Sequence, residues 1–175
     1  MQNVEFRYFR NPRNFAYRTD EIEPCSVCGK EGIWLYGGGF YGARDIDCIC
    51  DACLSDGKLK ELGIETNDAF EGTEEQKEGI VFRTPALPTW QDRCWPFREG
   101  DYCVFEKIAS KGDFADKEDF IRCFTSEDQE SSDLSDIWDN YLPEKPITSI
   151  QNWNYDISIY LFTRNGRKHC TWDAS

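Results

Sequence analysis

Histidine is nearly absent from this 175-residue sequence, which contains only one, His169. Most acid–base and nucleophilic schemes use a histidine, so any such scheme here depends on a single ring. Cys170 is adjacent in the sequence, but neighbouring side chains on a strand point to opposite faces. A nucleophile would have to come from Cys94, Cys103 or Cys123, and buried thiols are more often packing residues. We therefore predict no catalytic residues and a protein that is not an enzyme.

Long apolar runs are also missing. No stretch approaches the roughly 20 apolar residues of a membrane-spanning helix, and the first residues lack the apolar core of a secretory signal. Basic residues are few as well, since 20 Lys and Arg face 33 Asp and Glu, for a net charge of −13. That charge disfavours nucleic acid and anionic membrane as partners. We expect a cytoplasmic protein with a basic protein partner, although the charge can also serve only solubility.

Cysteine, by contrast, is abundant, and four of the nine residues form two Cys-x-x-Cys pairs. The pairs lie on either side of a glycine-rich segment, and a glycine at position 29 follows the first pair. Four thiolates of this kind can surround one tetrahedral Zn²⁺ ion at roughly 2.3 Å each. We therefore predict zinc as the cofactor, bound by Cys25, Cys28, Cys50 and Cys53. Four protein ligands leave no open position for water, so this zinc is expected to be structural.

The alternatives to a zinc site are a redox dithiol or two unrelated buried pairs. A redox pair normally opens a helix within a βαβ unit and needs no second pair. An odd number of cysteines without a secretory signal indicates a reducing compartment rather than a disulfide framework. Cys48 competes with Cys50 as a ligand, but only Cys50 has the two-residue spacing to Cys53.

Charge is unevenly distributed along the chain. The N-terminal arm is basic, whereas residues 113–139 form a strongly acidic block. Such a block can be an interaction face or simply a solvated helix surface. We predict that a basic partner contacts six carboxylates of this block: Asp116, Glu118, Asp119, Asp133, Asp136 and Asp139.

The mixture of helical and strand patterns predicts an α+β fold. Residues 157–163 and 168–172 alternate around Asn165-Gly166, the strongest two-residue hairpin signal. Thr73 and Gln76 match a capping box for a helix that reaches Arg83. The other expected elements are a strand at 4–9, a glycine-tipped hairpin at 33–41, short helices at 54–62 and 89–95, and amphipathic helices at 114–124 and 134–142.

The chain is expected to form one compact unit with three parts. They are an N-terminal zinc-ribbon-like β module at 1–63, an acidic linker or loop at 64–79, and an α+β part at 80–175 with antiparallel strands, short helices and a C-terminal β-hairpin. Four tryptophans can line a groove, but such residues more often form the core: these are Trp90, Trp95, Trp138 and Trp153.

Several short motifs together resemble the CbrC-like family, which is named for a bacterial colicin-tolerance protein. They are Cys25-x-x-Cys28-Gly-Lys, Gly39-Phe-Tyr41, Cys50-x-x-Cys53-Leu-x-Asp-Gly57, Arg83-Thr-Pro85, Trp90-Gln91 and Gly100-Asp-Tyr-Cys103. The likeness extends from about residue 4 to 105, weakens in the acidic block and returns in the last hairpin. Members of the family often carry a third Cys-x-x-Cys in that hairpin, which this sequence lacks. The resemblance implies tolerance of, or immunity to, a toxin.

Two functions are consistent with these features. The first is an acidic, zinc-containing binding protein of the immunity or tolerance type, which neutralises a basic bacterial toxin such as a nuclease by covering its phosphate-binding surface. The second is a structural or regulatory zinc-ribbon protein that has no toxin partner. The charge asymmetry and the resemblance favour the first.

Overall fold

The computed structural model describes residues 3–174 and has the α+β architecture that the sequence predicts. Its largest sheet is antiparallel, in the order β11-β10-β9, and consists of β9 (Val104–Ile108), β10 (Ile157–Arg164) and β11 (Arg167–Ala174). Asn165 and Gly166 join β10 to β11 with positive φ angles of 49° and 74°. The predicted C-terminal hairpin is confirmed, because a turn of this kind matches the twist of the strands that it joins.

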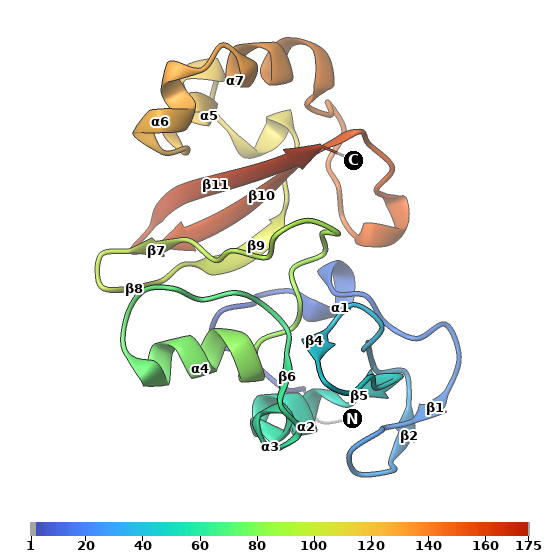
Figure 1. Ribbon diagram of the computed structural model, residues 1–175. Helices are drawn as coiled ribbons and strands as arrows, with labels where there is room; N and C mark the ends of the chain where they lie inside the picture. Colours follow the sequence, from blue (N-terminus) through green and yellow to red (C-terminus); the bar gives the residue numbers. More distant parts are fainter. Residues whose placement is uncertain (1–2, 175) are drawn as a thin grey trace.

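Short helices cover one face of this sheet (Figure 1). They are α5 (Lys117–Arg122), α6 (Ser126–Glu130), α7 (Asp133–Asp136) and η2 (Ile137–Tyr141), a π-helical turn that continues α7, with the single turns η1 (Lys111–Asp113) and η3 (Ile150–Asn152) nearby in the chain. Phe120, Leu134 and Ile137 pack with Leu161 and Cys170 of the sheet in one buried cluster. Within residues 3–174, no helix has both the length and the apolar composition to cross a membrane.

The N-terminal part of the chain lies on the other side of the sheet, and its strands have two residues each (Figure 1). They form three antiparallel pairs: β1 (Glu23–Pro24) with β2 (Glu31–Gly32), β3 (Leu35–Tyr36) with β5 (Cys48–Ile49), and β4 (Tyr41–Gly42) with β6 (Ile64–Glu65). The helices of this part are α1 (Pro12–Phe15), α2 (Asp51–Ser55), α3 (Lys58–Leu62) and α4 (Glu74–Arg83). A further pair, β7 (Phe97–Arg98) with β8 (Asp101–Tyr102), leads into β9.

Some local expectations are wrong. Residues 4–9 make isolated bridges, such as Phe9 with Phe105, rather than a strand. The glycine segment carries the chain from β3 to β4, and β3 pairs with β5, so the predicted hairpin at 33–41 does not form. Residues 89–95 are not helical. There the Thr89 hydroxyl accepts a hydrogen bond from the Gln91 N–H, and such local bonds compete with a helix.

Residues 64–79 contain more regular structure than a linker. They hold β6 and the first turns of α4, which starts at Thr73 with the predicted capping box. Between these elements Thr66 and Asn67 are fully buried. Their side chains donate hydrogen bonds to backbone carbonyls at the end of α4, from Thr66 to Thr84 at 2.6 Å and from Asn67 to Pro85 at 3.0 Å. The segment is therefore fastened to the helix that follows it.

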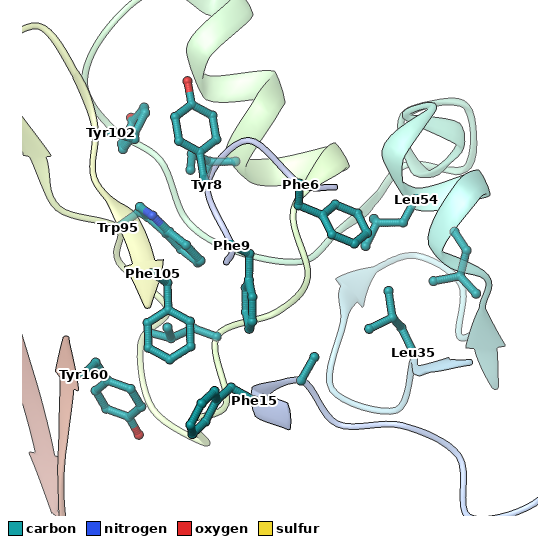
Figure 2. Close-up of a cluster of buried hydrophobic side chains, with 14 of the residues drawn as sticks. Phe6, Tyr8, Phe9, Phe15, Leu35, Leu54, Trp95, Tyr102, Phe105 and Tyr160 are labelled. Atoms are coloured by element: carbon teal, nitrogen blue, oxygen red, sulfur yellow. The ribbon is translucent and has the colours of Figure 1, made fainter. Parts of the chain in front are cut away.

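One buried cluster joins the N-terminal module to the central sheet. Figure 2 shows Leu35 and Leu54 of the module, Phe105 and Tyr160 of the sheet, and Phe9 between them. The Phe9 and Phe105 rings meet edge to face with centroids 4.8 Å apart, a geometry that adds to the stabilisation from burial. The two parts thus share a single core.

A buried carboxylate also ties distant segments together. Asp101 is only 8% exposed and accepts hydrogen bonds from Arg7 and Tyr8, each at 2.8 Å, and from Gln76 at 3.2 Å. An Arg164 nitrogen lies 3.9 Å from the same carboxylate. Burial opposes ionisation of Asp101, but the hydrogen bonds outweigh it, and the pKa of this group falls below its usual value.

Asp101→Asn should lower the free energy of unfolding at pH 7 by about 2–3 kcal/mol. The substitution removes the buried negative charge that Arg7 and Arg164 face. The folded pKa is depressed, so the contribution is complete above the unfolded pKa and is lost as the pH falls through the folded value. In urea denaturation, the difference between variant and wild type should shrink as the pH falls below the unfolded pKa of an aspartate, about 3.9, and through the lower folded value. Asp156→Asn, at an exposed position, is the matched control and should change stability by less than about 0.5 kcal/mol. Equal effects of the two substitutions would contradict this role.

Candidate metal centre

Four cysteine side chains meet at one point in the N-terminal module. The Sγ atoms of Cys25, Cys28, Cys50 and Cys53 lie within 4.8 Å of one another, and those of Cys28 and Cys50 are 3.8 Å apart. Sulfur ligands at roughly 2.3 Å from a tetrahedral ion are about 3.8 Å from each other. The structure thus brings together the four residues that the sequence predicts, at distances that can hold a metal ion.

The first pair of cysteines lies on a tight turn between β1 and β2. The Gly29 N–H donates to the Cys25 carbonyl at 2.8 Å, and the Cys25 N–H donates to the Lys30 carbonyl at 2.9 Å. Gly29 has a φ of 74°, in the left-handed region that favours glycine. The turn leaves Cys25 buried and Cys28 exposed, so one edge of the cluster reaches the surface.

The second pair opens helix α2. Cys50 is the N-cap residue, and its Sγ accepts a hydrogen bond from the Cys53 N–H at 3.4 Å. The Cys50 N–H in turn donates to the Cys25 Sγ at 3.2 Å. The backbone joins the two turns directly, since the Ser26 N–H donates to the Cys48 carbonyl at 3.0 Å. N–H groups aimed at sulfur favour the thiolate, which is the form that binds metals.

The thiols of the cluster differ in acidity. Burial opposes ionisation of Cys25, but N–H groups of Cys50, Cys28 and Val27 outweigh it and lower its pKa to about 7. Burial and hydrogen bonding with neighbouring sulfurs raise the pKa of Cys53. Each negative sulfur thus makes ionisation of the next one less favourable. A divalent cation reverses this, because it binds all four as thiolates and releases their protons.

Cys48 does not belong to the cluster. Its side chain is completely buried, and its Sγ donates to the Pro24 carbonyl at 3.4 Å. The geometry therefore agrees with choosing Cys50 over Cys48 as the ligand. A four-sulfur tetrahedral donor set is typical of zinc or of iron–sulfur centres.

The six carboxylates predicted to bind a partner divide into two groups. Four of them accept hydrogen bonds from the protein itself: Asp116, Asp119, Asp136 and Asp139. Asp119, for example, lies 2.5 Å from the Lys168 ammonium of β11, an interaction that lowers its pKa. The other two, Glu118 and Asp133, are exposed and have no side-chain partner within residues 3–174. Part of the acidic block therefore stabilises the helices, and part is free.

The single histidine lies on β11 with its side chain half-buried. Burial lowers the pKa of His169, so the ring is neutral at pH 7. Its Nε2 has no hydrogen-bond partner in the described part of the chain. Cys170 belongs to the buried cluster under the helices, where its pKa is raised by burial.

Two charged residues that organise the structure were not singled out from the sequence. One is Asp101, and the other is Arg93, which is 6% exposed. Arg93 stands beside Asp92 between Trp90 and Trp95, and this charged pair carries no sequence signal that the guanidinium is buried. Among the tryptophans, Trp95 is buried as expected, whereas Trp90 is 78% exposed.

We expect the purified protein to contain about one zinc ion per chain, measured by elemental mass spectrometry. Cys25→Ala and Cys53→Ala should each lose most of the metal, and chelation should lower the melting temperature, because the binding free energy contributes to folding. Cys48→Ala removes an equally buried thiol beside the site and serves as the control, which should keep its zinc. Zinc retained by both ligand variants, or lost only from the control, would show that other residues bind it.

Comparison with known proteins adds the family. The model of a family described as "Uncharacterised protein family (UPF0167)" matches residues 4–171. No solved structure matches the chain. The matched range includes both cysteine pairs, the aromatic core and most of the C-terminal hairpin. The chain therefore belongs to the uncharacterised protein family UPF0167, the family to which the CbrC-like motifs pointed.

Proposed function

We propose that this protein is an acidic binding protein, stabilised by one structural zinc ion, that neutralises a basic bacterial toxin such as a nuclease. The observation that carries the proposal is the excess of negative charge, −13 for the whole chain, together with a group of free carboxylates on the helices that cover the sheet. The CbrC-like motifs support it, because they imply tolerance of or immunity to a toxin.

The metal centre supports a binding role over a catalytic one. Four thiolates fill the coordination sphere of zinc, and a catalytic zinc needs a position for water or substrate. In this role the metal holds the turns at Cys25 and Cys50 in place. His169 is neutral and half-buried, so its ring is poorly placed to exchange protons with a substrate in solution. Nine cysteines without a disulfide also suit a reducing compartment such as the cytoplasm.

The free carboxylates lie on α5–α7, on the face of the sheet opposite the metal centre (Figure 1). We define the acidic face as four exposed residues without side-chain partners in the described chain: Glu118, Glu127, Glu130 and Asp133. Nuclease toxins carry basic groups where they hold phosphates. A negative face of this kind attracts such a surface over a distance of about one Debye length, and so speeds association.

The proposal is tested by measuring association of the protein with purified basic nuclease domains at low and high salt. Replacing the four residues of the acidic face with Gln or Asn should slow association about tenfold at low salt and much less at 0.5 M salt, because steering by charge is screened. The matched control replaces four equally exposed, unpaired carboxylates of the N-terminal module: Asp20, Glu21, Glu31 and Asp45. If both variants associate equally slowly, the effect comes from the overall charge and not from the acidic face. Absence of binding to every basic nuclease domain tested would count against the proposed function.

A second candidate is a regulatory or structural zinc-ribbon protein without a toxin partner. It is favoured by the apolar surface beside the metal centre, where Ile22 is 70% exposed and Ile33 is 43% exposed. Both residues, with Trp34, line a groove next to Cys50. A partner captured through Ile22 and Ile33, and insensitive to the acidic face, would support this second function.

A further inference from the structure

A small cleft lies between the N-terminal module and the segment that precedes β7. Its walls are aromatic and come from distant parts of the chain, namely Tyr17, Tyr36, Phe40 and Trp90, and Arg93 also lines it. Ligand sites commonly combine apolar walls with a few convergent polar groups. The cleft is separate from the metal centre and from the acidic face, so neither of them accounts for it.

Trp90 is the most exposed large apolar side chain of the cleft, at 78%. Its ring stands 5.9 Å from that of Tyr17, tilted by 37°. Tyr36, which also lines the cleft, is 47% exposed. These rings contribute little to the core, and together they offer flat apolar surfaces on which another ring can stack.

Arg93 brings a positive charge to the cleft, and no carboxylate is in direct contact with it, although Asp68 acts on it from a greater distance. Its guanidinium donates to the carbonyls of Thr66 at 3.3 Å and Thr89 at 3.4 Å, and more closely to that of Gly39. It also lies 5.1 Å from the centre of the Tyr41 ring. Within residues 3–174, no carboxylate oxygen lies within 4.0 Å of it. The direct contacts of this buried cation are carbonyls and a ring, so an anion that touches the guanidinium would add a contact that Asp68 does not make.

One nitrogen of this guanidinium is available. The Nη2 atom has no acceptor among the described residues, and a Cβ at position 39 would come within 2.7 Å of it. Glycine at that position therefore keeps the nitrogen uncovered. The Tyr17 hydroxyl likewise donates to no residue of the described chain, and burial raises the pKa of this group, so it stays protonated. Two donors thus remain for an acceptor that the protein itself does not supply.

We propose that this cleft binds a small ligand that combines one carboxylate with a flat apolar ring. The carboxylate accepts hydrogen bonds from Arg93 Nη2 and the Tyr17 hydroxyl, and the ring stacks on Trp90 against Tyr36. A single negative charge fits better than two. Asp68 is near enough to act on Arg93, and Asp173 on Tyr17, so a phosphate dianion would meet repulsion that a carboxylate largely avoids.

The test is a titration followed by ¹⁵N NMR at constant ionic strength, with benzoate, the neutral isostere benzamide and phenyl phosphate as probes. Benzoate should shift the Trp90 indole N–H signal and bind at least about tenfold more tightly than benzamide, since hydrogen bonds to a charged group are worth about 1.5–3 kcal/mol. It should also bind more tightly than phenyl phosphate. Equal affinities for benzoate and benzamide, a stronger affinity for phenyl phosphate, or no shift at Trp90 would each overturn the proposal.

Variants locate the site without depending on Arg93, whose replacement can unfold the loops that it joins. Trp90→Ala alters a mostly exposed ring and should weaken benzoate binding about fivefold, as loss of one stacking partner does. Tyr17→Phe should weaken it while keeping the ring. Phe70→Ala, at a ring that is 75% exposed outside the cleft, is the matched control and should leave the affinity unchanged. If Trp90→Ala and Tyr17→Phe both bind benzoate as the wild type does, the ligand lies elsewhere.

Discussion

Four sulfur atoms within 4.8 Å of one another are the constraint on which the N-terminal part of this protein depends. Every described strand before residue 103 has only two residues, and an isolated strand pair is at best marginally stable in water. Thiolates at such distances repel one another unless a cation lies among them. A metal ion bound there would convert a repulsive cluster into a connection that closes both turns and fixes where β3 and β5 meet.

This connection reaches beyond the module because the module shares its core with the central sheet. Leu54 follows directly on the second cysteine pair and belongs to the same buried cluster as Phe9, Phe105 and Tyr160. Asp101 reinforces the link from the other side, since it binds Arg7 and Tyr8 of the N-terminal arm. Loss of a metal ion bound at the four cysteines would therefore also destabilise the sheet, and the sheet in turn limits how far the cysteine turns can separate. We regard the two parts as one cooperative structure.

Features with a local cause could be predicted from the sequence, and features with a distant cause could not. The Asn165-Gly166 turn, the capping box at Thr73 and the two cysteine turns depend on a few adjacent residues. The pairing of β3 with β5 depends instead on the tertiary structure, because a strand of two residues carries no pattern that selects its partner. Arg93 was missed for the same reason, since the carbonyls that hold it come from Gly39, Thr66 and Thr89.

The carboxylates of the acidic block differ in the same way, since some are bonded within the protein and others are unpaired. Asp119 and Asp139 are paired with lysines at 2.5 and 2.7 Å, and Asp116 caps a helix, so these carboxylates are already stabilised by the protein. A basic partner gains less from them than from free carboxylates, because it would have to compete with existing bonds. Its attraction therefore depends on the unpaired residues of α5–α7 and on the long-range field. The formal charge of −13 would therefore affect the association rate of such a partner more than its affinity.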